Sequence, residues 1–186
     1  MKVKGIAVKS IKEYIKENYP EKYDEWIEAM PEASKKIHQD LIYASKLYSV
    51  IDAVLKPTET AAILFDKGDA EKMAYNMGKY SGMKALKSIY KIFVKITSLD
   101  FVLKRITSMY STYYDSGAVK LTHRDDKTAK FLILGLNEAE KLNLVRIAGW
   151  ADALFSVIAK VPTKVTHSII GTNGDEIEGE IVVSWE

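Results

Sequence analysis

The sequence predicts an α+β fold, in which an N-terminal helical layer packs on a C-terminal antiparallel sheet of about four strands. Apolar residues recur at steps of three and four through most of residues 1–116, as on the buried face of a helix. After Gly117 the spacing changes to alternation, and two hairpin-like segments flank one further helical segment. With 186 residues, of which 47% are hydrophobic, the chain has the size of a single domain, with a helical part at about 1–116 and a hairpin–helix–hairpin part at about 117–186.

The N-terminal third is expected to form short helices bounded by glycine and proline. The predicted helical segments are 6–18, 20–30 and, as one or two helices with the breaks left open, 34–55. Lys56, Pro57 and Thr58 are predicted to form a turn, which a short apolar segment at 60–65 follows.

The longest helix is expected at 69–95, and Gly78 and Gly82 lie in its interior. Glycine costs about 1 kcal/mol relative to alanine inside a helix, so another part of the molecule is expected to approach this backbone closely. Two explanations stay open. The glycines allow close packing against another helix, which is the preferred reading, or they form one wall of a ligand pocket.

A second bounded helix is predicted at 97–117. Thr97 or Ser98 can cap its start, and Gly117 can adopt the left-handed conformation that ends many helices. Beyond it the sequence predicts a hairpin from 118–123 and 129–134, a helix at 139–159, and a second hairpin from 164–170 and 178–185.

The composition restricts the classes of function. The 27 lysines and arginines nearly balance the 25 acidic residues, so nothing indicates a nucleic-acid partner. The chain has no cysteine, which excludes disulfides and thiolate catalysis. No segment approaches the ~20 apolar residues of a membrane-spanning helix, and the N-terminus lacks the apolar run of a signal peptide. We therefore expect a soluble, cytoplasmic protein without an integral membrane segment.

No catalytic or metal-binding motif is present. The three histidines are far apart, and no nucleophile elbow, phosphate loop or H-E-x-x-H motif occurs. His38 is expected on the surface of a helix, and His123 and His167 on the solvent side of strands. Because His167 with the acids near Asp175 does not make a four-ligand zinc shell, the sequence predicts no catalytic and no metal site, and a protein that is not an enzyme.

The C-terminal half resembles one superfamily of domains. The segments that carry the resemblance are MGKYSGMKALKSIYKIFVK, LDFVLKRITSMYSTYYDSG, AGWADALF and GTNGDEIEGEIVVSW. They are similar to a family of unknown function that is expanded in myxobacteria and is grouped with vinyl-4-reductase-like ligand-binding domains, haem-nitric-oxide/oxygen-binding (H-NOX) sensors and TRAPP vesicle-tethering subunits. The N-terminal VKGIAVKSIKEYIKENY also resembles the start of H-NOX domains. The resemblance implies an apolar cavity between helices and sheet that takes haem, acyl chains or other small hydrophobic molecules, and it implies frequent dimers.

The residues that hold haem in H-NOX domains are not found at the matching positions. The resemblance places the axial histidine near Ser108, and a hydroxyl is a poor axial ligand. The Tyr-x-Ser-x-Arg motif that grips the haem propionates is replaced by LNEAEKL. Tyr110, Tyr113 and Tyr114 could ligate ferric haem as tyrosine does in catalase. On balance the sequence is interpreted as having no cofactor, with a haem-based gas sensor as the less favoured alternative.

We interpret the chain as a non-catalytic sensory or regulatory domain that binds a small hydrophobic ligand, for example a fatty acid, and that forms a homodimer. Methionine adapts to irregular ligands, and tyrosine offers an apolar face with one hydroxyl. The predicted pocket wall consists of Met77, Phe93, Met109, Tyr110, Tyr113 and Tyr114. Lys104 or Arg105 is expected at the mouth as the partner of an acidic head group. A protein–protein interaction subunit with a filled core stays open as the alternative, because helical spacing does not separate pocket lining from packed core.

Overall fold

The computed structural model describes residues 1–88, 99–159 and 162–186, and it confirms the predicted α+β class. The helices are α1 (Gly5–Asn18), α2 (Tyr23–Ala29), α3 (Glu32–Gln39), α4 (Lys56–Phe65), α5 (Ala70–Ser88), α7 (Leu99–Tyr113) and α8 (Lys141–Ile158). The strands are β1 (Lys2–Lys4), β2 (Leu47–Ser49), β3 (Ala118–Arg124), β4 (Thr128–Asn137), β5 (Thr163–Asn173) and β6 (Glu176–Trp185). Single helical turns lie at Pro20–Lys22 and Glu138–Glu140, and a π-helical turn at Ile51–Leu55. No helix in these three ranges is long and apolar enough to cross a membrane.

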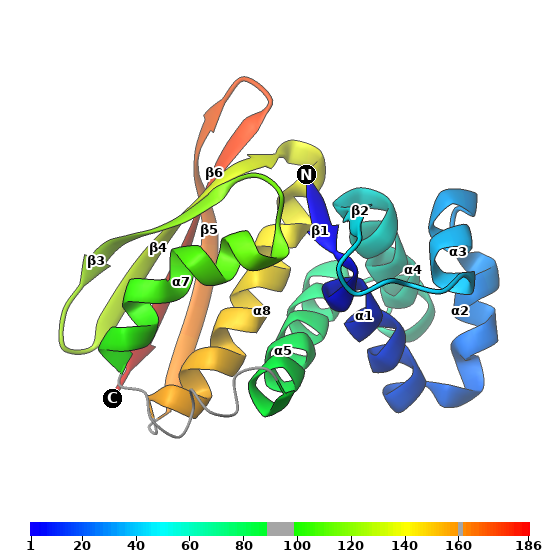
Figure 1. Ribbon diagram of the computed structural model, residues 1–186, viewed down its shortest axis with the longest axis horizontal. Helices are drawn as coiled ribbons and strands as arrows, with labels where there is room; N and C mark the ends of the chain where they lie inside the picture. Colours follow the sequence, from blue (N-terminus) through cyan, green and yellow to red (C-terminus); the bar gives the residue numbers. More distant parts are fainter. Residues whose placement is uncertain (89–98, 160–161) are drawn as a thin grey trace.

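The C-terminal part is a four-stranded antiparallel sheet, as predicted, with the strand order β3-β4-β6-β5. Alternate residues of β4 and β6 are buried, so only one face of the sheet is covered. Helices α7 and α8 lie over that face (Figure 1). Both hairpins begin and end within a few residues of the predicted segments, because alternation and turn residues are local signals.

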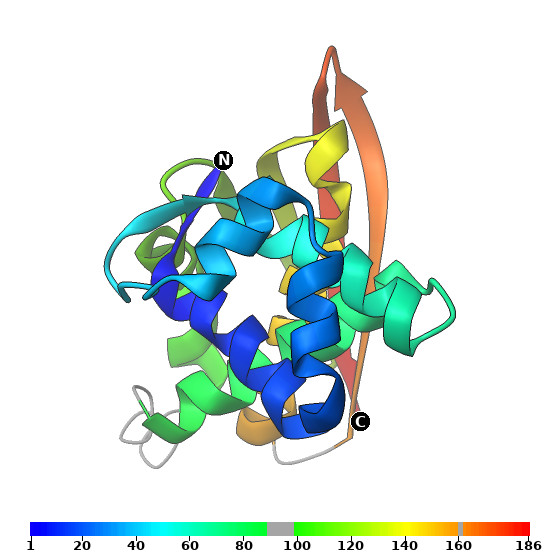
Figure 2. The same cartoon turned by 90° about the vertical axis from the view of Figure 1, so that its right-hand side faces the viewer.

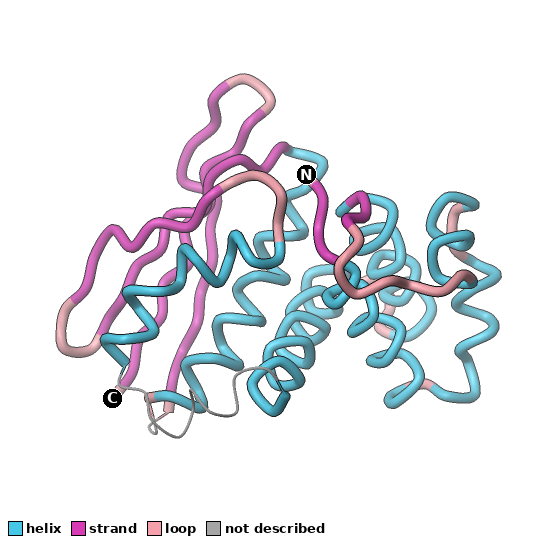
Figure 3. The backbone as a smooth tube through the Cα atoms, in the orientation of Figure 1, coloured by secondary structure: helices cyan, strands magenta, loops and turns pink. Residues whose placement is uncertain are grey.

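The N-terminal helices form a second hydrophobic core on the side of α5 and α8 away from the sheet. Figures 2 and 3 show helices α1 to α4 gathered at this end of the molecule, with strands β3 to β6 at the other. Trp26 is fully buried there, and its indole Nε1 donates a hydrogen bond to the carbonyl oxygen of Pro57 at 2.9 Å. The predicted turn at Pro57 is instead the first turn of α4, where the missing N–H of proline costs nothing.

A small two-stranded sheet, which was not predicted, lies near the N-terminus. It connects the first residues of the chain with the end of α7. Strand β1 pairs with β2 in antiparallel register, and Val3 also bridges to Tyr114 at the end of α7. The amide of Lys2 donates to the Asp115 carboxylate at 2.8 Å. Three-residue strands carry too little alternation to be recognised from sequence, and the expected helical structure over 34–55 is wrong at residues 47–49, which form β2.

Helices α5 and α8 cross at glycines. A Cβ atom built on Gly78 would lie 2.0 Å from the carbonyl oxygen of Arg146, and one on Gly149 would lie 2.0 Å from the carbonyl oxygen of Tyr75. Neither position has room for a side chain. The close helix packing predicted for Gly78 and Gly82 is the arrangement observed, and it brings the backbone of α8 directly against α5.

The prediction that His38 lies on the surface is wrong. His38 is fully buried, its ring meets the ring of Trp26 edge-on at 5.1 Å, and its Nε2 lies 3.0 Å from the carbonyl oxygen of Ala53. Burial lowers the pKa of His38 to about 4. The residue is therefore a neutral core histidine in the N-terminal core.

Candidate functional site

An apolar pocket lies between α7, α8 and the covered face of the sheet, and it extends to α1 and α5. The space that the lining side chains leave free has a volume of about 60 Å³ and is partly open to solvent. The pocket is therefore a narrow slot with one open side. Its lining residues are Ala7, Ser81, Ile106, Met109, Tyr110, Tyr113, Tyr114, Val119, Phe131, Ile133, Arg146, Ile147, Trp150, Ala151 and Ile181.

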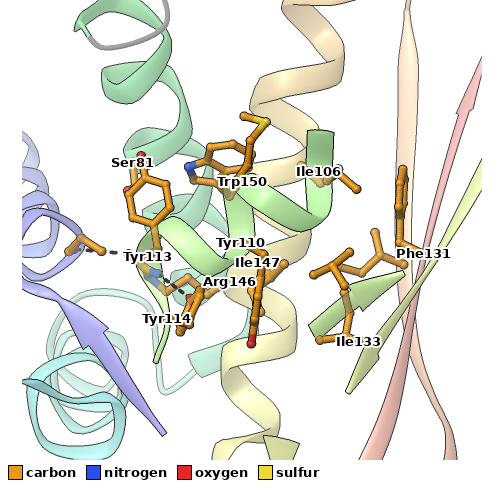
Figure 4. A pocket seen from close by; sticks show the side chains of 15 residues that line it. Ser81, Ile106, Tyr110, Tyr113, Tyr114, Phe131, Ile133, Arg146, Ile147 and Trp150 are labelled. Carbon is orange, nitrogen blue, oxygen red and sulfur yellow. Dashed lines mark hydrogen bonds between the residues drawn. The ribbon is translucent and has the colours of Figure 1, made fainter. Parts of the chain in front are cut away.

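The two ends of the pocket differ in chemistry. Figure 4 shows Phe131 and Ile133 on the sheet side, where the walls are entirely aliphatic or aromatic carbon. At the other end, toward α1 and α5, lie Tyr113, Tyr114 and Arg146. An elongated or planar molecule would place its apolar part against the sheet and its polar part against these groups.

Aromatic rings shape the walls. Tyr110 and Tyr114 stack on one another with their ring centres 4.6 Å apart, and Tyr113 meets Trp150 edge-on at 6.2 Å. Tyr110 and Tyr113 lie in the last turn of α7 and Tyr114 follows it directly, so that two of the rings are three and four residues beyond Tyr110 and all three reach the slot. Burial raises the pKa of the Tyr110 phenol well above its ordinary value, and this hydroxyl therefore stays protonated at neutral pH.

The polar end is built around Arg146 of α8, which is only 4% exposed. Its Nη2 donates to the carbonyl oxygen of Ala7 at 3.3 Å, and its Nη1 donates to the Tyr114 hydroxyl at 3.4 Å. The Tyr114 hydroxyl in turn donates to Oδ1 of Asn143 at 3.2 Å. The Nε of Arg146 is buried and has no hydrogen-bond acceptor within the described part of the chain.

The structure brings four of the predicted pocket residues together. Met109, Tyr110, Tyr113 and Tyr114 all line the slot. Met77 does not, because it faces the N-terminal core and its sulfur lies 3.4 Å from the Thr58 hydroxyl. Phe93 lies outside the described residues.

The structure does not place Lys104 or Arg105, predicted at the pocket mouth, among the residues that line the slot. Both side chains are exposed, and the guanidinium of Arg105 lies over the ring of Phe101 at 4.4 Å. The cation at the pocket is Arg146, which sequence reasoning missed. It stands inside the mostly apolar segment LNLVRIAGWADALF, where its neighbours at helical spacing, Leu142, Asn143, Gly149 and Trp150, are buried or half-buried.

Comparisons with known proteins identify the fold. No protein-family model matches the sequence, and no curated protein matches it. Solved structures of H-NOX domains do match. An Fe(II) unliganded H-NOX protein from K. algicida has a TM-score of 0.73 at 10% identity, with 98% of this chain and 96% of that chain covered. An oxygen-binding H-NOX domain related to soluble guanylate cyclases, in its oxygen complex, has a TM-score of 0.69 at 10% identity, covering 98% and 95%. The chain therefore has an H-NOX-like fold.

The prediction of no cofactor is contradicted by this likeness. A further H-NOX structure, described as probing haem distortion, has a TM-score of 0.68 at 10% identity over 98% of this chain and 95% of that chain, so the fold is one whose solved examples bind haem. The prediction rested on Ser108 at the position matched to the axial histidine and on the missing Tyr-x-Ser-x-Arg motif. Ser108 is exposed and does not line the slot, whereas Ile106, Met109, Tyr110 and Tyr113 are the residues of α7 that do.

The donor atoms at the slot fit a haem held through oxygen. No histidine lies among the lining residues of the described chain, but Tyr110, Tyr113 and Tyr114 each bring a phenol, and tyrosine is the axial ligand of catalase haem. The guanidinium of Arg146 is suited to a carboxylate such as a propionate. Because the Tyr110 phenol is held protonated by burial, coordination through it requires loss of that proton and becomes easier as the pH rises.

Proposed function

We propose that this chain is a ligand-binding sensory domain that holds a small hydrophobic molecule in the slot between α7, α8 and the sheet, and that it does not act as an enzyme. The observation that carries the proposal is the slot itself: an apolar, aromatic-walled space between helices and sheet, whose polar lining residues lie toward α1 and α5. Sites for small molecules are mostly apolar and have a few polar groups that fix the orientation of the ligand. The alternative of an interaction subunit with a filled core is less well supported, because the slot leaves part of the interior unfilled.

Haem is the specific candidate that the H-NOX-like fold supports. A bound haem supplies an iron atom whose open position can take a diatomic gas. The side chains of this chain would contribute a phenol from α7 to the iron, apolar walls from β4 and α8 that exclude water, and a guanidinium for a propionate. The second candidate is an acyl chain, which the narrow shape of the slot favours.

Native mass spectrometry of the purified protein, followed by denaturing release, tests the proposal. We expect an excess mass over the polypeptide that leaves as one small hydrophobic molecule, and the released species identifies it. The same spectrum reports whether the protein is a homodimer. Because ligand can be lost during purification, a protein without excess mass is titrated with haem and with dodecanoic acid. The proposal is overturned if the protein purifies without ligand and neither compound binds at micromolar concentration.

Trp150 provides a direct optical readout. Its indole lies in the slot wall, so a bound ligand changes its fluorescence, and haem quenches it. Trp26 and Trp185 lie outside the lining, and a Trp150→Phe variant measures their contribution. Binding in the slot predicts that the ligand-dependent part of the signal is lost in this variant. A signal that survives it comes from another place on the protein.

A further inference from the structure

The most unusual group in the described structure is the guanidinium of Arg146. It is buried beside an apolar slot, and none of the described carboxylates forms an ion pair with it. The nearest acids on and before α8 are already engaged, because Glu140 accepts the N-terminal ammonium of Met1 at 2.8 Å and Asp152 pairs with Lys79 at 2.6 Å. A buried charge without a counter-ion is expensive, and proteins rarely keep one without a use.

The hydrogen bonds of Arg146 leave most of its N–H donors unused. A guanidinium has five N–H donors, and the described structure gives it two acceptors, at 3.3 and 3.4 Å. Both distances lie beyond the usual 2.7–3.2 Å range, and the bonds are therefore weak. The Nε donor has no acceptor among the described residues. An anion that reached this end of the slot would find unused donors in a water-poor environment, where charge-assisted hydrogen bonds are strongest.

Hydroxyl groups near Arg146 can also donate hydrogen bonds to an anion. The Tyr114 hydroxyl touches both Arg146 and Asn143, so it can turn toward a new acceptor without losing all of its partners. Ser81 of α5 adds a further hydroxyl to the lining. These groups are the neutral donors that complete a carboxylate site, and no described acidic side chain faces them across the slot.

From these contacts we infer that the ligand of this slot carries a carboxylate, and that Arg146 is the residue that binds it. The inference rests on the proposed function, since it concerns the same slot. The ligand is a molecule with an apolar chain or ring system and an acid group at one end. The acid group is buried against α8 and α1, and the apolar part lies against the sheet. Two sources share this chemistry, an acyl carboxylate and the carboxylates of a tetrapyrrole.

The test compares acids with neutral partners of the same shape. Dodecanoic acid is paired with dodecanol, and protoporphyrin IX with its dimethyl ester, and binding to the wild-type protein is measured at pH 8 through Trp150 fluorescence and calorimetry. One charge-assisted hydrogen-bonded pair corresponds to about tenfold to a hundredfold in affinity. We therefore expect the acid of at least one pair to bind about tenfold more tightly than its neutral partner or better. The pair that shows the preference identifies the source.

Arg146→Met is the decisive variant, and Arg105→Met is its matched control on the exposed face of α7. The preference for the acid should fall to about one in Arg146→Met and stay unchanged in Arg105→Met, while the neutral partner binds all three proteins alike. Arg146→Lys keeps the charge without the planar fork and should retain part of the preference.

Stability without ligand separates a binding role from a structural one. Because none of the described carboxylates pairs with Arg146, Arg146→Met should unfold at a temperature equal to or above that of the wild type. A large loss of thermal stability in Arg146→Met would show that the guanidinium serves the fold, and it would overturn the inference, as would equal binding of acid and neutral partner in the wild type. If neither member of any pair binds, the proposed function itself fails and the inference with it.

Discussion

The carbonyl oxygen of Arg146 lies directly above the Cα of Gly78, so close that a Cβ at position 78 would stand 2.0 Å from it. The residue that provides the polar end of the slot is thus held in place, through its own backbone, by the crossing of α5 and α8. The three atoms nearest to a Cβ at Gly78 all belong to the backbone of Arg146, so Gly78 determines how far α8 stands from α5 and therefore where the guanidinium lies.

The first prediction concerns that crossing. Gly78→Ala gains about 1 kcal/mol of helix propensity, but it forces α8 away from α5, and overpacking of this kind costs about 1–3 kcal/mol or more. We expect a net loss of about 2 kcal/mol in the free energy of unfolding, measured by urea denaturation. Gly171→Ala is the control, because its nearest neighbour is the flexible end of Glu178 at 3.2 Å. A fully stable Gly78→Ala protein would mean that the two helices do not meet as described.

A buried histidine makes the N-terminal core sensitive to acid. The pKa of His38 is lowered to about 4 in the folded protein, mainly by burial, and it returns to about 6.5 when the chain unfolds. The unfolded chain therefore binds the extra proton between these values, and stability falls as the pH drops from about 6.5 to about 4. The free energy lost across this window is about 3 kcal/mol.

Urea denaturation at several pH values between 7 and 4 checks this dependence. His38→Gln keeps a donor for the carbonyl of Ala53 but does not titrate, so its stability should depend less on pH than that of the wild type over this window. His123→Gln is the control, since His123 is exposed and contacts only the carboxylate of Asp125 in the described structure. Equal pH slopes in the wild type and His38→Gln would contradict the assignment of a neutral, buried His38.

The sequence predicted the elements whose signals lie within a short stretch of the chain, and it missed those that depend on distant residues. Both hairpins and α8 were predicted within a few residues, because alternation, turn residues and helical spacing all act over short distances. Strands β1 and β2 were missed, since they pair only through contacts distant in sequence. His38 was assigned to the surface because the polar residues Gln39 and Asp40 follow it, and only the docking of Trp26 against it shows that this side is buried.

The pocket was predictable in part for the same reason. Tyr110, Tyr113 and Tyr114 share one face of α7, and helical spacing alone identifies that face. The sequence did not indicate which cationic residue lies at the slot. Arg105 lies on the same helix as the tyrosines and was chosen for that closeness, whereas Arg146 is brought to the slot by the crossing of α5 and α8. Packing between distant segments of the chain decides where two helices meet. Glycines in a sequence indicate that another segment approaches closely, but they do not identify that segment.

Two indole groups allow a matched test of burial. Trp26 and Trp185 each donate a hydrogen bond of 2.9 Å to a backbone carbonyl, of Pro57 and Asp126 respectively, but only Trp26 is fully buried. Trp26→Phe leaves a buried carbonyl without its donor and a small cavity, and it should cost about 2–3 kcal/mol. Trp185→Phe exposes its carbonyl to water and should cost about 1 kcal/mol or less. Thermal unfolding of the two variants compares them, and a similar loss in both would contradict the burial of Trp26.

The last prediction tests whether ligand occupies the slot at all. Met109 and Ser108 are neighbours on α7, and Met109 lines the slot whereas Ser108 is exposed. Met109→Trp places an indole in the space that the ligand needs, so the affinity for the released or titrated ligand should fall about tenfold or more. Ser108→Trp adds the same group on the opposite side and should bind as the wild type does. Circular dichroism and thermal unfolding show whether both variants keep the fold. Because the two substitutions differ only in the direction the new ring takes from one helix, equal affinities would place the ligand outside the slot, and a loss confined to Met109→Trp would place it between α7 and α8.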